Sequence, residues 1–251
     1  MRKFVIFFLA LFVLSCSCVR RFPDPEGSDV RDVASHTVKV FVELGGVKMT
    51  KDSTGEILKR SDTVKWVGSG VVVDIRGSKS LVMTAAHVSN IDPFMMGQDE
   101  VGNPALFIVQ TEKLTVETLE GRMCDAKQIK ADSTHDIAIL DVDCIAGTKA
   151  EFASELPPIG AMVLTSGAAL GYHPENVFVI TDGRFMGIDK KDDKVVVTVP
   201  AASGHSGSGM FYKGKIFGIL TARMIDFEHI TLGTQLQFLN ELFASARGEW
   251  K

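Results

Sequence analysis

The chain carries a histidine, an aspartate and a serine in short motifs whose residue types suit nucleophilic catalysis. The motifs are Thr-Ala-Ala-His at 84–87, Asp-Ile-Ala-Ile-Leu at 136–140 and Gly-His-Ser-Gly-Ser-Gly at 204–209. Acyl transfer needs a hydroxyl nucleophile, a base within hydrogen-bond reach and an acid that orients the base. We therefore predict that Ser206 attacks a carbonyl, His87 takes and returns the proton, and Asp136 orients the imidazole.

Glycines around the serine predict a tight turn that aims backbone N–H groups at one point. The N–H groups of Gly204 and Ser206 would form the oxyanion hole at that point. Side chains at 204 and 207 would obstruct such a turn, and glycine tolerates its unusual backbone angles. Ser208 is the alternative nucleophile, but the position of Ser206 directly after Gly204-His205 favours Ser206.

Together the three motifs resemble those of the trypsin-like, chymotrypsin-fold serine proteases, over about residues 37–246. The cysteine-poor bacterial branch is the most similar, including the periplasmic high-temperature-requirement proteases. Two positions depart from the family's usual Gly-Asp/Asn-Ser-Gly-Gly pattern, since His205 precedes the serine and Ser208 replaces a glycine. The resemblance implies a serine endopeptidase. Because His205 replaces the aspartate that pairs with a freed N-terminus in vertebrate-type trypsins, we do not expect activation by N-terminal insertion.

The resemblance also implies where the substrate side chain binds. One wall of the primary pocket would include Ala201 and Ala202, and the other would include Thr221, Ala222 and Arg223. No acid stands where trypsin-type enzymes place one for Lys or Arg. We expect a small or apolar residue before the cleaved bond, with an acidic residue, attracted by Arg223, as the alternative.

A competing hydrolase fold fails two tests. The α/β-hydrolase elbow Gly-x-Ser-x-Gly requires a glycine at the position that Ser208 occupies, and its catalytic residues follow the order Ser, Asp, His. The present order is His, Asp, Ser, which excludes that fold.

The elements that must position these residues read as β-strands. Alternating Val38, Val40 and Val42 open a series of short apolar runs separated by Gly, Asp, Asn or Lys. We predict an all-β fold of two six-stranded antiparallel β-barrels, with a C-terminal α-helix. The protease domain would span 36–247, with a first barrel at about 36–147, a second at about 158–232 and the helix at about 234–246.

Cys124 and Cys144 lie in a predicted hairpin centred near Thr134. Paired positions in such a hairpin have numbers that sum to about 268, which places the two cysteines opposite each other. An exported protein meets an oxidising compartment, so we predict a disulfide. Two buried free thiols are the alternative.

The N-terminus has the features of an export signal. Arg2 and Lys3 precede an apolar run at 4–14, which is shorter than a bilayer span. The run ends in Val-Leu-Ser-Cys, which resembles a bacterial lipobox. We predict a lipoprotein signal peptide at 1–15, lipidation of Cys16 and a polar tether at 16–35; a plain signal peptide is the alternative. The protein would then reside in the bacterial envelope, held at a membrane by its lipid, or else be secreted.

Composition excludes several partners and cofactors. The net charge is −4 and no Lys/Arg block stands out, so no nucleic-acid partner is expected. No spacing among the histidines matches a zinc site, and we expect no metal or organic cofactor. Substrates would be exported or envelope proteins or peptides. The alternatives are a catalytically weak, lipid-anchored binding protein on a protease scaffold and a protease that processes itself once. The sequence predicts no oligomeric state.

Overall fold

The computed structural model describes residues 27–51, 54–99, 102–172, 177, 179–224 and 229–250. The predicted signal peptide and Cys16 lie outside these residues. Within them, no helix has the length and apolar character needed to cross a membrane.

The first barrel is closed by six antiparallel strands in the order β1-β2-β3-β7-β6-β5, with β5 pairing back to β1. The strand β4 adds to the outer side of β5. The strands are β1 Thr37–Lys51, β2 Ile57–Arg76, β3 Lys79–Thr84, β4 Phe94–Gln98, β5 Pro104–Glu117, β6 Met123–Asp132 and β7 Ile137–Val142.

The second barrel is also closed by six antiparallel strands, in the order β12-β9-β10-β11-β14-β13, with β12 pairing to β13. A short strand, β8, adds parallel to β13. The strands are β8 Glu151–Phe152, β9 Met162–Gly167, β10 Val179–Asp189, β11 Lys194–Val197, β12 Gly209–Tyr212, β13 Lys215–Arg223 and β14 Thr231–Gln235. The predicted pair of six-stranded barrels is therefore confirmed.

Alternation along the strands explains the barrel interiors. Val38, Val40 and Val42 of β1 are buried, as their two-residue period predicts. A larger apolar cluster joins the two barrels, since Val71 and Met83 of the first pack in one core with Phe211 and Ile219 of the second. This shared core fixes one barrel against the other and so fixes the residues that lie between them.

The predicted C-terminal helix is confirmed as α4, Leu236–Glu249. Leu239, Leu242 and Ala246 of this helix enter the shared core. Arg247 forms an ion pair of 2.9 Å with Asp74 of β2, whose carboxylate also contacts Lys149 at 3.1 Å. Burial raises the pKa of Asp74, but contacts with these two cations and a backbone N–H outweigh it and lower that pKa.

The N-terminal segment differs from the expectation. The predicted tether at 16–35 was expected to lack any core-forming pattern, yet α2 spans Gly27–His36. Val33 of this helix is fully buried in the shared core, and Thr37 Oγ1 donates to its carbonyl. Two valines in a polar stretch, Val30 and Val33, give too little periodicity to predict a helix, and here tertiary packing supplies the stability.

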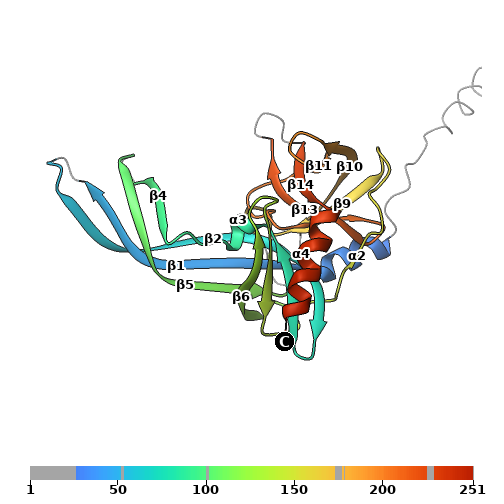
Figure 1. The fold of residues 1–251 in the computed structure, drawn as a ribbon, viewed down its shortest axis with the longest axis horizontal. Helices are drawn as coiled ribbons and strands as arrows, with labels where there is room; N and C mark the ends of the chain where they lie inside the picture. The colour runs from blue at the N-terminus through green and yellow to red at the C-terminus, as the bar shows by residue number, and fades with distance from the viewer. Residues whose placement is uncertain are drawn as a thin grey trace, which may run out of the picture.

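A long arm projects from the first barrel (Figure 1). We define the arm as residues 44–51 of β1, 57–64 of β2, 104–111 of β5 and all of β4. Its four strands pair in the order β2-β1-β5-β4. The alternation of Val38, Val40 and Val42 does not continue into residues 44–51 of the arm, where small and charged residues interrupt it.

The cysteine prediction is confirmed, because Cys124 and Cys144 form a disulfide with Cα atoms 6.0 Å apart. The strands β6 and β7 pair Ala126 with Val142 and Gln128 with Leu140, so the numbers sum to 268 as predicted. A bulge near Lys130 shifts the register closer to the turn without disturbing the pairing at the cysteines.

Candidate active site

His87 lies on α3, a single turn at Ala86–Ser89 that follows directly from β3. Its Nδ1 is 2.8 Å from Oδ2 of Asp136, and its backbone N–H donates to Oδ1 of the same carboxylate at 2.9 Å. The carboxylate thus contacts both the ring and the main chain of His87. These contacts fix the imidazole and do not involve its Nε2. The His87 side chain is 47% exposed, so a substrate can reach it.

Asp136 ends the turn between β6 and β7, in a left-handed backbone conformation with φ of 59°. Aspartate visits this region more readily than most residues do. Asp132 holds the turn, since its Oδ1 accepts from the N–H groups of Thr134 and His135. Burial raises the pKa of Asp132, but hydrogen bonds from His135 outweigh it and lower that pKa.

A lysine from the second barrel supports the same turn. The Nζ of Lys194 donates to the carbonyl of His135 at 3.0 Å and to Thr234 Oγ1 at 3.2 Å. Burial lowers the pKa of Lys194, while the charges of Asp136, Asp132 and Asp192 act in the opposite direction. The carboxylate that orients His87 is therefore set by contacts from both barrels.

The loop before β12 forms the expected glycine turn. Gly204 and Gly207 have φ values of 92° and 90°. A Cβ atom at Gly204 would lie 2.0 Å from the carbonyl oxygen of Ala168, and one at Gly207 would lie 2.0 Å from that of Ser69. Only glycine fits either position, as the sequence predicted.

Ser69 of β2 holds this loop from behind. Its Oγ donates to the carbonyl of Gly204 at 2.6 Å and accepts from the N–H of Ala168 at 2.9 Å. Its own N–H donates to the carbonyl of Ser206 at 2.7 Å. Thr84 Oγ1 in turn donates to the Ser69 carbonyl at 2.7 Å. One buried serine therefore binds the carbonyls on both sides of His205.

Among the described residues, the N–H groups of Gly204 and Ser206 have no acceptor, and neither does the hydroxyl of Ser206. The described residues likewise offer no partner to His87 Nε2. Gly68 links the two sides, since a Cβ there would lie 2.6 Å from Val88 Cγ1 and 3.1 Å from the Ser206 carbonyl. The structure thus brings His87 and Asp136 into contact, while among the described residues His87 Nε2 and Ser206 Oγ form no hydrogen bond with each other.

The two departures from the family pattern are both buried. His205 is 2% exposed, and its Nδ1 accepts from the N–H of Ala202 at 3.3 Å. Burial lowers the pKa of His205. Ser208 is fully buried beside Gly167, where an added Cβ would lie 2.1 Å from its hydroxyl. A glycine on the facing strand therefore makes room for the extra side chain at 208.

The residues predicted for the substrate pocket lie on two elements. Ala201 and Ala202 precede the glycine turn and are partly buried. Thr221 is buried near the end of β13, while Ala222 and Arg223, the last two residues of that strand, are exposed. β13 bulges between Leu220 and Ala222, which separates Thr221 from the regular ladder with β14.

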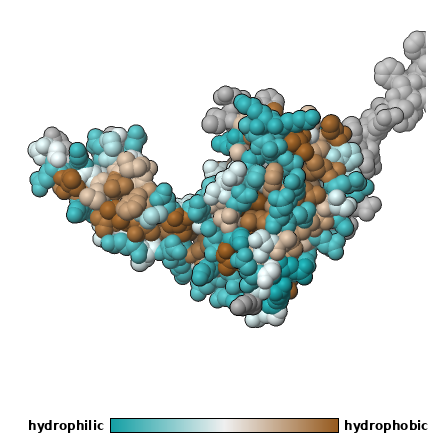
Figure 2. Space-filling view, viewed as in Figure 1, coloured by the Kyte–Doolittle hydropathy of each residue, from teal (hydrophilic) through white to brown (hydrophobic). Residues whose placement is uncertain are grey.

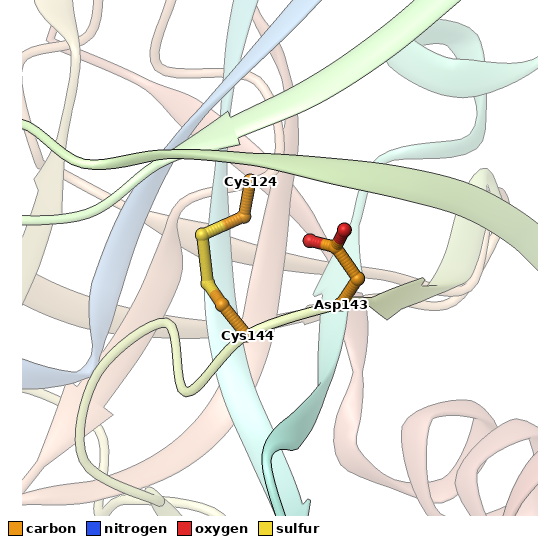
Figure 3. Close-up of side chains that lie close together, drawn as sticks. All are labelled: Cys124, Asp143 and Cys144. Atoms are coloured by element: carbon orange, nitrogen blue, oxygen red, sulfur yellow. A yellow bond between two sulfur atoms is a disulfide. The ribbon is translucent and has the colours of Figure 1, made fainter.

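Figure 3 shows the cluster of Cys124, Asp143 and Cys144, whose ligand atoms lie within 4.8 Å of one another. The two sulfurs are bonded to each other and cannot act as thiolate ligands. The two cysteines of this cluster therefore act as a disulfide that links β6 to the segment after β7, and not as metal ligands.

Several supporting residues were not identified from the sequence. Ser69 stands between two glycines in a strand, and that Gly-Ser-Gly pattern was the available signal. Lys194 and Gly167 carry no local signal. The role of Lys194 depends on the approach of the second barrel to the first, and that of Gly167 depends on the pairing of β9 with β12.

Comparison with known proteins gives a consistent result. Residues 68–219 match the model of the trypsin-like peptidase domain. No curated protein matches the chain. A serine endoprotease from Yersinia pestis aligns at a TM-score of 0.64 and 18% identity, over 89% of this chain and 67% of the other.

The Rv3671c protease from M. tuberculosis is also similar in structure. Its active form aligns at a TM-score of 0.58 and 20% identity, over 88% of this chain and 86% of the other. An inactive mutant of Rv3671c gives 0.60 and 17%, over 91% of this chain and 96% of the other.

Proposed function

From the membership of this chain in the trypsin-like peptidase family, we propose that His87, Asp136 and Ser206 form its catalytic triad. The protein is a serine endopeptidase, and its substrates are proteins or peptides. The observation that best supports the triad is the double contact of Asp136 with the ring and the backbone N–H of His87.

In the proposed mechanism, Ser206 Oγ attacks the carbonyl carbon of the scissile bond while His87 Nε2 takes the hydroxyl proton. The new C–O bond pushes the carbonyl electrons onto oxygen. Asp136, bonded to Nδ1, holds the ring in the tautomer that leaves Nε2 free to accept, and stabilises the imidazolium that forms.

The negative oxygen would be bound by the N–H groups of Gly204 and Ser206. Both donors lack acceptors among the described residues, so they cost no rearrangement when charge develops. The hydrogen bonds from Ser69 to the Gly204 and Ser206 carbonyls support this orientation, because they hold the adjacent peptide units in place.

Collapse of the tetrahedral intermediate breaks the C–N bond, and the imidazolium of His87 gives its proton to the leaving amine. Water then attacks the acyl-enzyme, with His87 again as the base, and releases Ser206. Each step uses side-chain and backbone groups of this chain, and we propose no metal or organic cofactor.

The test is Ser206→Ala, with Ser208→Ala as the matched control. Ser208 is buried and its hydroxyl has no partner among the described residues, so its loss removes no hydrogen bond found there. We expect the Ser206 variant to lose labelling by a fluorophosphonate probe and peptide hydrolysis, while the Ser208 variant keeps both. Retained labelling in Ser206→Ala would refute the assignment.

We further propose that the protein is exported and lipidated at Cys16, and cleaves exported or envelope proteins. The support is the sequence Val-Leu-Ser-Cys after an apolar run, in a chain that also forms a disulfide. Cells expressing Cys16→Ala should lose incorporation of labelled palmitate and release the protein from the membrane fraction. Unchanged incorporation would contradict lipidation at this residue.

We propose Ala201, Ala202, Thr221, Ala222 and Arg223 as the walls of the specificity pocket. Substrate profiling of the purified enzyme should return a small or apolar residue before the cleaved bond. If Arg223 instead selects acidic residues, Arg223→Ala will reduce that preference. The alternative is a weakly active binding protein, and it rests on His205 and Ser208. Both residues are buried, and among the described residues His205 Nε2 and the Ser208 hydroxyl have no hydrogen-bond partner.

A further inference from the structure

The arm has one strand edge that leads directly to the nucleophile. On one side β2 pairs with β1 from Ile57 to Val71, while on the other side it pairs with β3 only from Val71 onward. Within the described residues, the outer edge of β2 from 57 to 67 therefore has no partner strand. Figure 1 shows this arm standing clear of the barrels.

The register identifies the groups on that edge. Ser69 directs its N–H away from β1, to Ser206, and Thr63 directs its N–H to its neighbour Asp62. The pairing with β1 has no bulge between 57 and 71, so every odd-numbered residue there turns its N–H and C=O outward. At about 3.3 Å per residue, the edge extends roughly 40 Å from Ser69 to Ile57.

The beginning of the edge lies on the leaving-group side of the site. His87 would protonate the leaving amine, so the substrate residues after the cleaved bond lie toward His87. The helix turn that carries His87 rests on β2, since Trp66 Nε1 donates to the Val88 carbonyl at 2.8 Å. A substrate chain that leaves the site past His87 therefore meets the free edge of β2.

We propose that the substrate segment following the cleaved bond adds to the arm as a strand, antiparallel to residues 57–65 of β2. The inference rests on the proposed function. Main-chain hydrogen bonds to the edge would provide affinity that depends little on sequence, as in other cases of strand addition.

The side chains along the edge define which segments fit best. Lys59 and Lys65 lie on one face. Lys65 forms an ion pair of 2.8 Å with Glu43, whereas within the described residues Lys59 has no ion-pair partner. The same face carries two apolar rows, because Met49 lies opposite Leu106 and Leu106 opposite Met96, while Val47 lies opposite Ile108 and Ile108 opposite Phe94.

A groove of about 430 Å³ lies on this face, lined in part by Met49, Ile57 and Met96. Met96 is 76% exposed, and Figure 2 shows apolar residues gathered along the arm. Methionine adapts its shape to varied partners. We therefore infer a preference for extended segments that carry acidic side chains near Lys59 together with large apolar ones.

The experiment compares two peptides cut at the same bond, chosen from a digest of unfolded casein. One ends two residues after the bond, and the other continues for about ten residues. We expect kcat/KM to be about tenfold higher or more for the long peptide. Equal values for both peptides would overturn the inference while leaving the proposed function intact.

Ser61→Pro removes one outward N–H without touching the ladder to β1, and Ser61→Ala is its matched control. The proline variant should lose the advantage of the long peptide and keep the rate on the short one. Retention of the full advantage in Ser61→Pro would contradict strand addition. A fall in both rates with a lower melting temperature would signal misfolding of Ser61→Pro. In that case the Lys59→Glu variant tests the inference instead.

Lys59→Glu should lower kcat/KM severalfold for a long peptide with an acidic tail and raise it for one with a lysine tail. Lys48→Glu, on the opposite face of β1, should change neither. No effect of Lys59→Glu on either tail would overturn the proposed preference. A dimer that dissociates in Ser61→Pro would identify a second copy as the occupant instead. If casein is not cut and Ser206 is not labelled, the proposed function itself fails.

Discussion

Ser69 Oγ donates a 2.6 Å hydrogen bond to the carbonyl of Gly204, which connects the first barrel to the turn that carries the oxyanion donors. We predict that Ser69→Ala lowers kcat by about tenfold to a hundredfold with little change in KM, because the turn loses its fixed orientation before charge develops.

The control for Ser69→Ala is Ser166→Ala. Ser166 is also a fully buried serine, and its hydroxyl has no partner in the part of the chain that the structure describes. Steady-state kinetics on a short peptide measure both variants. An unchanged kcat in Ser69→Ala would show that the turn keeps its shape without this bond.

Asp136→Asn should reduce kcat by about 10³–10⁴-fold while the fold persists. The present carboxylate accepts at both oxygens from His87. An amide offers one acceptor and one donor, so the ring must turn or adopt the tautomer that cannot accept the serine proton. Kinetics should be measured beside circular dichroism, and nearly full activity would exclude Asp136 from the triad.

His205 predicts a loss of stability in mild acid. Burial lowers its pKa in the folded protein, whereas the unfolded chain titrates near the ordinary value of 6.5. Below that value the unfolded state binds the extra proton first, so the free energy of unfolding falls as pH drops toward the folded pKa.

Thermal unfolding from pH 7.5 to 5 should therefore show a steeper decline for the wild-type protein than for His205→Asn. Asparagine can keep a polar contact with Ala202 but does not titrate. Parallel curves for the two proteins would mean that another group governs the acid sensitivity.

Removing the disulfide should lower stability without abolishing the site. Cys124 and Cys144 are 20 residues apart, and a loop of this length corresponds to about 3 kcal/mol in the chain-entropy model. Urea unfolding of the double alanine variant gives the measure. A reducing agent should reproduce the loss in the wild-type protein and have no effect on the variant.

The sequence predicted contacts correctly where the residues of a short motif or a single hairpin determine them. The motifs of His87 and Asp136 predicted two residues that do lie in contact, and the hairpin register placed Cys124 opposite Cys144. In each case the spacing along one strand or turn carries the information.

The elements that were missed depend on distant contacts. Val33 enters a core built by residues far along the chain, and Gly167 makes room for Ser208 across a strand pair. The arm extends β1 through mostly half-buried residues and β2 through exposed ones, so their sequences show no alternation of buried and exposed positions. Such features arise from assembly of the barrels and have no local periodicity.

The burial of Val33 also limits where the enzyme can work. Helix α2 begins at Gly27, and its Val33 is buried in the shared core. With Cys16 lipidated as proposed, the 11 residues 16–26 would connect the lipid to this helix. A chain of that length reaches at most about 40 Å when fully extended. The active site would then sample a thin layer next to the bilayer, where segments emerging from the membrane or lying close to it are the accessible targets.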